Sequence, residues 1–229
     1  GVILIDDFEA LMEAAAFFAK APRPKARGVA VVATSGGAAI MAADKAEVHG
    51  VEMPQPSAAA TAVLLQHIPD FGSARNPCDV TAQVVNNPLS LGACGEALMS
   101  ETQYGAIVMP QPGAFEFHTP RIETLGKLSR DHGKITCNVL ISQWLQGPAA
   151  KEAEANEHVA LFRSMDRCFA TIAAWHKYYE RRDAGERVYA RVSGTAAAAA
   201  ASKLIGQATA PTLAEREAKA VLAEYGVPV

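Results

Sequence analysis

A run of small residues follows an apolar segment near the start of the chain, and its residue types suit the binding of an anion. Val29–Ala33 is continuously apolar, as expected for a strand buried on both faces of a parallel sheet. The next five residues are Thr34, Ser35, Gly36, Gly37 and Ala38, and a helix is expected over Ala38–His49. The first turn of a helix has free backbone amides and the positive end of a dipole. The two glycines would let a phosphate approach those amides closely, so the segment is either a phosphate-binding turn or only a tight turn.

The better-known phosphate and nucleophile motifs do not fit this turn. G-x-G-x-x-G and G-K-[ST] are absent, which argues against a dinucleotide-binding Rossmann site and against a P-loop. The turn also departs from G-x-S-x-G, because Ala33 stands where that motif has its first glycine. A hydrolase that recruits Asp79 and His118 for a triad is therefore disfavoured.

A second group of polar residues follows other expected strands. Asn76 precedes Pro77 in the loop 71–80, a combination that commonly starts a turn, and Asp79 could brace the loop or face a ligand. Gln111 follows the strand expected over Tyr104–Met109, and the pair Gln143-Trp144 follows the next strand. Ligands of parallel sheets bind beyond the carboxyl ends of the strands, so these loops are expected to meet the turn at 34–38 on one edge.

The elements that must position these loops alternate along the chain. Strands are expected at Val29–Ala33, Tyr104–Met109, Ile135–Ile141 and Val159–Phe162, and helices at Ala38–His49, Ser57–His67, Pro88–Glu101, Pro120–His132, Ala149–Glu157 and Met165–Arg181. Such alternation predicts an α/β fold with a doubly wound, mostly parallel sheet and helices on both faces, which makes three layers.

Two less regular stretches are also assigned from pattern. Val2–Ile5 and Val51–Met53 are predicted to be short strands. Asp6 and Glu9 form a D-x-x-E signal for the start of a helix. The predicted buried face of that helix consists of Phe8, Leu11, Met12, Ala15 and Phe18.

The character of the chain changes after Arg182. Residues 183–211 contain the alanine run Ala196–Ala201 and are predicted to be a linker that is helical in part. Thr212 and Glu215 then form a T-x-x-E capping box for a short helix. Because the chain begins with Gly1 and ends where a strand would begin, we expect it to be part of a longer protein.

Composition excludes several classes of protein. The net charge of −3 and the pI of about 6.1 argue against nucleic acid as a partner. No apolar run approaches the roughly 18–20 residues of a membrane span, so no membrane partner is expected. The four cysteines are widely spaced, which favours reduced, buried thiols and a cytoplasmic location. No two histidines have ligand spacing on one helix, so no metal site is expected, and His118 is assigned to a loop.

Several segments together resemble one family. Val29–Asp44 (V-A-V-V-A-T-S-G-G-A-A-I-M-A-A-D) resembles a segment of the NDP-forming acyl-CoA synthetases, the superfamily that includes succinyl-CoA synthetase. Ser73–Val80 (S-A-R-N-P-C-D-V) is similar to the family's S-x-R-N-P-x-D-V, and Leu161–Ser164 to its F-R-S segment. Leu213–Lys219 and Tyr225–Val229 resemble the opening of the ATP-grasp domain in single-chain members.

The resemblance implies a division of the chain and a role for its turn. Residues 1–182 would be the second flavodoxin-like, succinyl-CoA ligase-like domain, 183–211 the linker, and 212–229 the first helix of an incomplete ATP-grasp domain. In the family, the helix after S-G-G points its amino end at a phosphohistidine, which on this chain assigns phosphate binding to Ser35, Gly36, Gly37 and Ala38. Asn76, Pro77, Asp79 and Gln111 would form an inter-domain or ligand loop region.

The resemblance also implies a reaction and partners. The family converts ATP or GTP, a carboxylate and CoA into acyl-CoA, ADP or GDP, and phosphate, through an acyl-phosphate and a phosphohistidine. The histidine motif, S-H-T-G-like, is expected upstream, so no catalytic residue is expected in this chain, which alone would bind no cofactor and lack activity. CoA, ATP and Mg would belong to the intact enzyme, and the CoA-binding, phosphohistidine and ATP-grasp domains would be partners within one protein.

The acid substrate and assembly into a homo-oligomer stay open. One alternative is a non-catalytic module that senses acyl-CoA within a protein lysine acetyltransferase. A free-standing FMN protein is disfavoured, because a T-x-T-G-x-T-like phosphate loop is absent.

Overall fold

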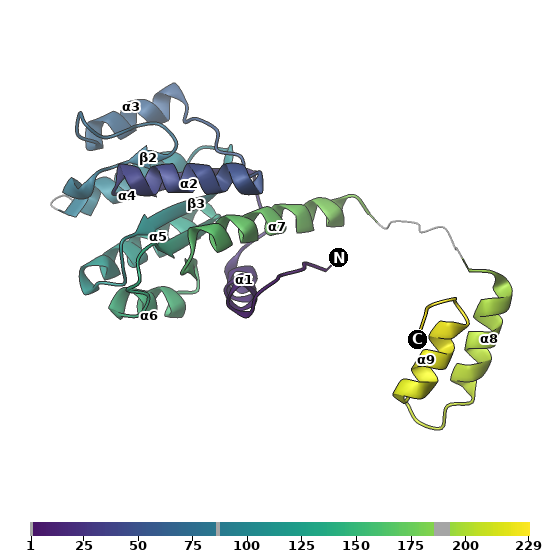
Figure 1. The fold of residues 1–229 in the computed structure, drawn as a ribbon. Coiled ribbons are helices and arrows are strands. Elements are labelled where there is room, and N and C mark those ends of the chain that lie inside the picture. The colour runs from purple at the N-terminus through teal and green to yellow at the C-terminus, as the bar shows by residue number, and fades with distance from the viewer. Residues whose placement is uncertain (1, 86–87, 186–192) are drawn as a thin grey trace. The chain divides into compact units, whose positions relative to one another are not determined.

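The computed structural model of the chain describes residues 2–85, 88–185 and 193–229 (Figure 1). These residues form two compact units, Gly1–Ala184 and Gly185–Val229. Each unit is described by itself below.

A parallel sheet forms the centre of the first unit. Its strands are β1 (Gly28–Ala33), β2 (Cys78–Asp79), β3 (Tyr104–Gln111), β4 (Ile135–Leu140) and β5 (Val159–Phe162). They pair in the order β2-β1-β3-β4-β5, and every pairing is parallel. The predicted doubly wound sheet is confirmed, and β5 lies at one edge of it. Because all strands run the same way, the loops that follow them leave from one edge of the sheet.

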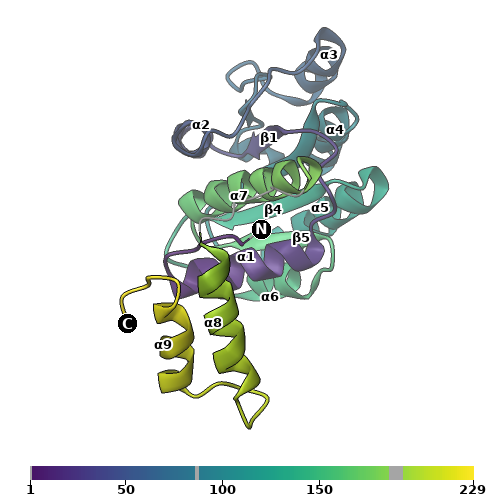
Figure 2. The same ribbon diagram turned by 90° about the vertical axis from the view of Figure 1, so that its right-hand side faces the viewer.

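Helices cover both faces of this sheet. One face carries α1 (Phe8–Lys20), α2 (Gly36–His49) and α7 (Met165–Asp183), and the other carries α3 (Ala58–His67), α4 (Pro88–Met99), α5 (Thr119–His132) and α6 (Pro148–Ala155). The short 3-10 helices η1 (Ala82–Val85) and η2 (Glu116–His118) lie in the connections. In Figure 2, α2, β1 and α4 follow one another from left to right, as do α7, β4 and α5. The expected three-layer, flavodoxin-like arrangement is confirmed.

Each layer interface has its own apolar core. On the α1, α2 and α7 face, the rings of Phe17 and Trp175 meet edge to face with their centroids 5.6 Å apart, and both side chains are fully buried. On the other face, Leu64, Met109 and Leu125 belong to one buried cluster. Burial of this apolar surface is the main force that holds the helices against the sheet.

Several helix ends are fixed by residues close to them in the chain. Ser57 and Ser164 each cap a helix, because their hydroxyl oxygens accept the backbone N–H of Ala60 at 3.1 Å and of Arg167 at 3.3 Å. Gly50 ends α2 with a φ of 64°, a left-handed conformation that glycine adopts without steric cost.

Two predicted strands are wrong. Val2–Ile5 pairs with no strand among the described residues, and Val2 and Leu4 are almost fully exposed. Val51–Met53 is also outside the sheet, although the carbonyl of Glu52 accepts the N–H of Val29 at 2.8 Å. A short apolar run becomes a strand only where a neighbouring strand supplies its hydrogen bonds.

The predicted start and buried face of α1 are also wrong. Asp7, and not Asp6, caps the helix by accepting the N–H of Ala10 at 2.7 Å. The buried residues are Glu13, Ala14 and Phe17, whereas Phe8, Leu11 and Met12 of the predicted face are exposed. The reason is that Glu13 accepts two hydrogen bonds from the Arg167 guanidinium of α7, which turns this polar position inward.

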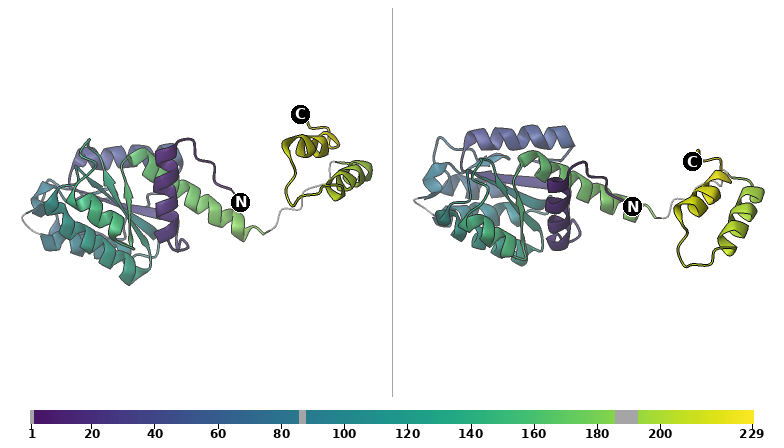
Figure 3. Two further views of the ribbon diagram at one scale, coloured as in Figure 1. Left: turned by 90° about the horizontal axis from the view of Figure 1, so that it is seen from below. Right: turned by 60° about the horizontal axis from the view of Figure 1, so that its bottom comes forward.

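The second unit contains two helices that pack against each other, α8 (Thr195–Gly206) and α9 (Glu215–Ala223) (Figure 3). Helix α8 falls within the segment predicted as a linker, of which residues 186–192 lie outside the described residues. Helix α9 begins after Ala214 and not at Thr212: the carboxylate of Glu217 accepts the Ala214 N–H at 2.8 Å. The predicted cap at Thr212 is therefore wrong by two residues.

Two general features concern the described part of the chain as a whole. None of its helices combines the length and the apolar character needed to cross a lipid bilayer. Its four cysteines are free thiols and all are buried, as the sequence predicts.

Candidate functional site

The amino end of α2 is a row of backbone donors at the carboxyl edge of β1. Ser35 precedes the helix in an extended conformation, and its hydroxyl does not cap it. The first backbone bond into the helix runs from the N–H of Ala39 to the carbonyl of Ser35, at 3.0 Å. Among the described residues, no acceptor is bonded to the amides of Gly36, Gly37 and Ala38. Three donors at a positive helix end are therefore available to an anion.

Exposure differs along this turn in a way that suits a ligand. Thr34 is half-buried, Ser35, Gly36 and Gly37 are exposed, and Ala38 is buried against the sheet. The small side chains leave the backbone accessible at the first turn. The last strand residue, Ala33, is fully buried, so the turn is fixed to the core at one end.

Asp79 lies beside the same turn. Strand β2 pairs with the end of β1, with Asp79 opposite Ala33. A β-carbon placed on Gly36 would be 3.2 Å from Oδ2 of Asp79, while Oδ1 accepts the N–H of Thr81 at 2.9 Å. A carboxylate near the amino end of a helix stabilises that helix, but it opposes the binding of a second negative charge. Asp79 thus lies beside the predicted phosphate turn and brings a negative charge close to it.

Asn76, by contrast, is engaged in bonds within the fold. Its carboxamide accepts the N–H of Val31 at 3.0 Å and donates to the carbonyls of Val29 at 2.8 Å and Pro54 at 2.9 Å. Asn76 is 4% exposed and is joined to Pro77 by a cis peptide bond. The Asn76 carboxamide therefore bonds to backbone groups of β1 that no neighbouring strand residue reaches. This role is structural.

Gln111 lies on the other face of the sheet from α2. Its side chain is buried, and Oε1 accepts a hydrogen bond from Nη1 of Arg121 in α5 at 2.9 Å. Burial lowers the pKa of the Arg121 guanidinium. The carbonyl of Gln111 accepts the N–H of Ile141 at 3.0 Å, which joins the loops after β3 and β4. The sheet therefore separates the Gln111 side chain from the amides of α2.

Arg121 was not among the residues singled out from sequence. A usable signal existed, because a cation in the first turn of a helix opposes the helix dipole and calls for a specific reason. His118 differs from its predicted place in a loop, since it ends η2, is 2% exposed, and contacts the Gly113 carbonyl through Nδ1 at 2.8 Å. Desolvation is the main cause that lowers the pKa of His118, which favours its neutral form.

Two further histidines lie on helices of the first unit. His49 is in the last turn of α2, at the opposite end from the glycines, and its Nε2 is 3.1 Å from Oδ1 of Asp166. His176 is buried on α7. Among residues 2–85, 88–185 and 193–229, no three His, Cys, Asp or Glu side chains gather in a way that could hold a metal ion.

The fold and its glycine turn define the first unit as a flavodoxin-like α/β domain with unbonded helix amides at its carboxyl edge. No protein-family model matches the chain, and no curated protein matches it. Solved structures do share its fold.

The dinucleotide forming acetyl-coenzyme A synthetase 1 of Ca. Korarchaeum cryptofilum is similar in its apo form over 80% of this chain, with a TM-score of 0.65 and 16% identity. Its complex with phosphate and ADP is similar over 82%, with a TM-score of 0.66 and 15% identity. PH0766 from Pyrococcus horikoshii OT3 is similar over 81%, with a TM-score of 0.65 and 14% identity.

The shared feature is the fold, and it extends over part of each of these proteins. This chain covers 40% to 42% of their lengths. The resemblance to acyl-CoA synthetases that the motifs indicate is thus confirmed as a similarity of structure.

Proposed function

We propose that this chain is a domain of an NDP-forming acyl-CoA synthetase, in which the amino end of α2 stabilises a phosphoryl group carried by a histidine of another domain. The observation that carries the proposal is the row of unbonded amides at the exposed residues Gly36 and Gly37 and at the buried residue Ala38. The motifs around it and the similarity to an acetyl-coenzyme A synthetase support the assignment to this enzyme class.

The proposed contribution of α2 to the reaction is electrostatic stabilisation. In the proposed reaction the histidine takes the phosphoryl group of ATP or GTP, passes it to the carboxylate, and CoA then displaces phosphate from the acyl-phosphate. Each transfer moves negative charge that fixed donors can stabilise without reorganisation. The three amides and the positive helix end would supply such donors, and the uncommitted hydroxyl of Ser35 would add a fourth.

In the proposed role, this chain depends on other domains for the reaction itself. The phosphorylated histidine would belong to another domain, and the nucleotide with its Mg²⁺ and CoA would also be bound outside this chain. Because Asp79 opposes a free anion, dissolved phosphate is expected to bind weakly. A phosphoryl group held in place by a docked domain avoids much of that cost. The isolated chain is therefore expected to form no acyl-CoA from ATP, CoA and a carboxylate.

A pair of substitutions at Gly37 tests the proposal. Gly37→Pro removes one donor amide, and the fold tolerates proline in this part of a helix, since Pro120 occupies the same position in α5. Gly37→Ala keeps the amide, and its β-carbon would meet only Oγ of Ser35, at 3.8 Å. The ligand is a short peptide that carries a hydrolysis-resistant phosphohistidine analogue, and binding is followed by calorimetry.

Gly37→Pro is expected to weaken binding about tenfold, the effect of one lost charge-assisted hydrogen bond, whereas Gly37→Ala is expected to bind like the unmodified chain. Equal affinities of the two variants, with circular dichroism showing both folded, would overturn the role of α2.

A further inference from the structure

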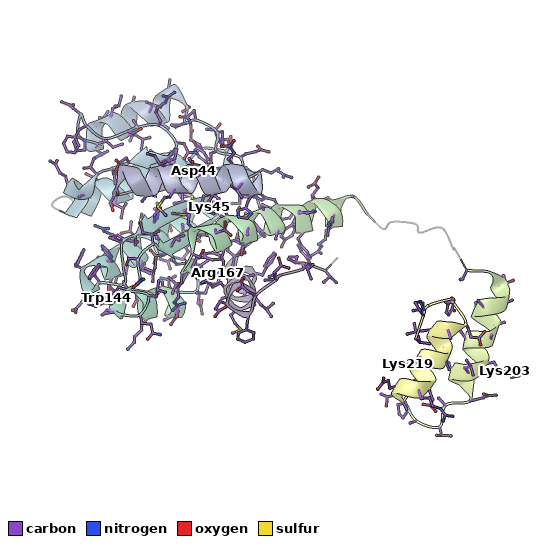
Figure 4. All side chains as sticks on the ribbon, viewed as in Figure 1. Asp44, Lys45, Trp144, Arg167, Lys203 and Lys219 are labelled. Carbon is purple, nitrogen blue, oxygen red and sulfur yellow. The ribbon has the colours of Figure 1, made fainter. Side chains whose placement is uncertain are left out.

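An aromatic platform lies at the carboxyl edge of the sheet, in the loops that follow β3 and β4. It consists of Phe115, Phe117 and Trp144. The rings of Phe115 and Phe117 stack with centroids 5.3 Å apart, and Trp144 lies 4.9 Å from Phe115. Phe117 is 59% exposed and Trp144 is 53% exposed, so large apolar rings face solvent. Figure 4 shows Trp144 projecting from this end of the first unit.

The loops that carry the platform are held in place by the fold. The Ala114 N–H donates to the carbonyl of Trp144 at 3.1 Å, and Nε of Arg163 donates to the carbonyl of Leu145 at 3.2 Å. Close packing requires glycine at two positions. A β-carbon on Gly113 would be 2.9 Å from the Phe115 ring, and one on Gly147 would be 2.4 Å from the Ala114 carbonyl oxygen. A ligand would thus meet a preformed surface and lose little affinity to ordering.

An open depression of about 580 Å³ adjoins the platform and is lined by Gln143, Trp144, Leu145 and Gln146. None of these residues is charged. The carboxamides of Gln143 and Gln146 are exposed and form no hydrogen bond within the described part of the chain, so each offers both donors and an acceptor. Such a lining suits an uncharged, flat molecule with a polar edge better than an anion or a cation.

We propose that this depression binds the purine base of a nucleotide or nucleoside, which stacks on Trp144 while Gln143 and Gln146 bond to its edge. Aromatic side chains commonly hold bases in this way, because every base has a flat π-face. A protein partner would need roughly 800 Å² of buried surface on each side, far more than two exposed rings provide. The proposal does not depend on phosphate binding at α2.

The two tryptophans of the chain allow a direct test, since Trp144 is half-exposed and Trp175 is fully buried. The full chain is titrated with adenosine and with guanosine, with excitation at the red edge where nucleosides do not absorb. A saturable change in emission is expected for one or both. Ribose 5-phosphate, which lacks a base, is expected to produce none.

Two variants locate the site, and a control variant shows whether removal of an exposed ring alone affects binding. Binding, measured by calorimetry, is expected to weaken at least tenfold in Trp144→Leu and in Phe117→Ser. The control Phe71→Leu removes another exposed ring, 69% exposed in a different loop, and is expected to bind as the unmodified chain does.

Three results would overturn the proposal: no saturable response to either nucleoside, an equal response to ribose 5-phosphate, or undiminished binding in folded Trp144→Leu. Self-association of the chain that is lost in Trp144→Leu, without nucleoside binding, would instead identify the platform as a contact between copies.

Discussion

The carboxylate of Asp79 lies against the first residue of α2: a β-carbon placed on Gly36 would be 3.2 Å from Oδ2 of Asp79. A side chain at position 36 would require the Asp79 carboxylate to shift by a few tenths of an ångström. The closeness of Asp79 also places a negative charge beside the three amides proposed to hold a phosphoryl group. The two roles of this helix end, stability and anion binding, therefore oppose each other at Asp79.

Replacement of Asp79 separates these two roles. Asp79→Asn keeps an oxygen for the Thr81 N–H but removes the charge. The free energy of unfolding is expected to fall by about 0.3–1 kcal/mol, the usual value of a charge at a helix end, while affinity for inorganic phosphate rises. Urea unfolding and a phosphate titration at low salt measure both. The control Asp44→Asn, at an exposed position within α2, is expected to leave phosphate affinity unchanged, and equal behaviour of the two variants would contradict the account.

Asn76 is expected to matter for stability and not for binding. Asn76→Ala removes two hydrogen bonds to buried backbone groups of Val29 and Val31 and one to the half-buried carbonyl of Pro54. The loss is expected to be roughly 3 kcal/mol, because unpaired buried groups are costly. Asn156→Ala, which removes one hydrogen bond to the His158 N–H at a half-buried site, is expected to cost less than half as much. A stable Asn76→Ala variant with weakened phosphate binding would restore Asn76 as a ligand residue.

The buried carboxylate of Glu13 joins α1 to α7. It accepts hydrogen bonds from Nε and Nη2 of Arg167, at 2.7 and 3.0 Å, and from the N–H of Arg163 at 2.9 Å. Glu13→Gln leaves the Arg167 cation without its counter-charge, so the free energy of unfolding should fall by about 3 kcal/mol. Glu9→Gln, at an exposed position of the same helix, serves as control and should change it by less than 1 kcal/mol. Similar losses in both variants would show that the buried pair contributes nothing special.

His176 should make the fold sensitive to acid. Burial on α7 is the main cause that lowers its pKa from 6.5 to about 4, and its Nε2 has no partner within the described residues. The unfolded chain therefore binds more protons than the folded chain between these two values. Stability from this group is full above pH 6.5 and is lost as the pH falls toward 4, by roughly 3 kcal/mol.

The variant His176→Phe isolates this effect from that of other titrating groups. It keeps a flat ring next to Trp175 but cannot take up a proton. Between pH 7 and pH 4 the unmodified chain should lose about 3 kcal/mol more unfolding free energy than the variant. Parallel pH profiles from chemical denaturation would contradict the assignment.

The sequence predicts best where local chemistry decides the structure. The predicted strand Val29–Ala33 and the predicted helix end at His49 are confirmed. The caps at Ser57 and Ser164 likewise depend on residues close to them in the chain. The alternation of apolar runs also predicts the parallel sheet, because buried strands must be covered by helices on both faces.

Predictions from sequence fail where residues far apart in the chain determine the structure. The inward turn of Glu13 depends on Arg167, far along the chain, and no periodicity of α1 contains that information. The role of Asn76 depends in the same way on backbone groups near residues 29–31 and 54. The sequence places Gln111 at the same sheet edge as the phosphate turn, but the direction of its side chain, toward the face opposite α2, depends on Arg121 of α5.

The central claim is that the amides of Gly36, Gly37 and Ala38 hold a phosphoryl group presented by a histidine. Amide NMR shifts of the isotope-labelled chain test it most directly, during titration with the peptide that carries the phosphohistidine analogue and with the same peptide lacking phosphate. The amides of Thr195, Ala196 and Ala197 are the internal control, since α8 also begins without a side-chain cap. We expect large, saturable downfield shifts at residues 36–38 with the phosphorylated peptide alone. Shifts of equal size at residues 195–197, or none at residues 36–38, would contradict it.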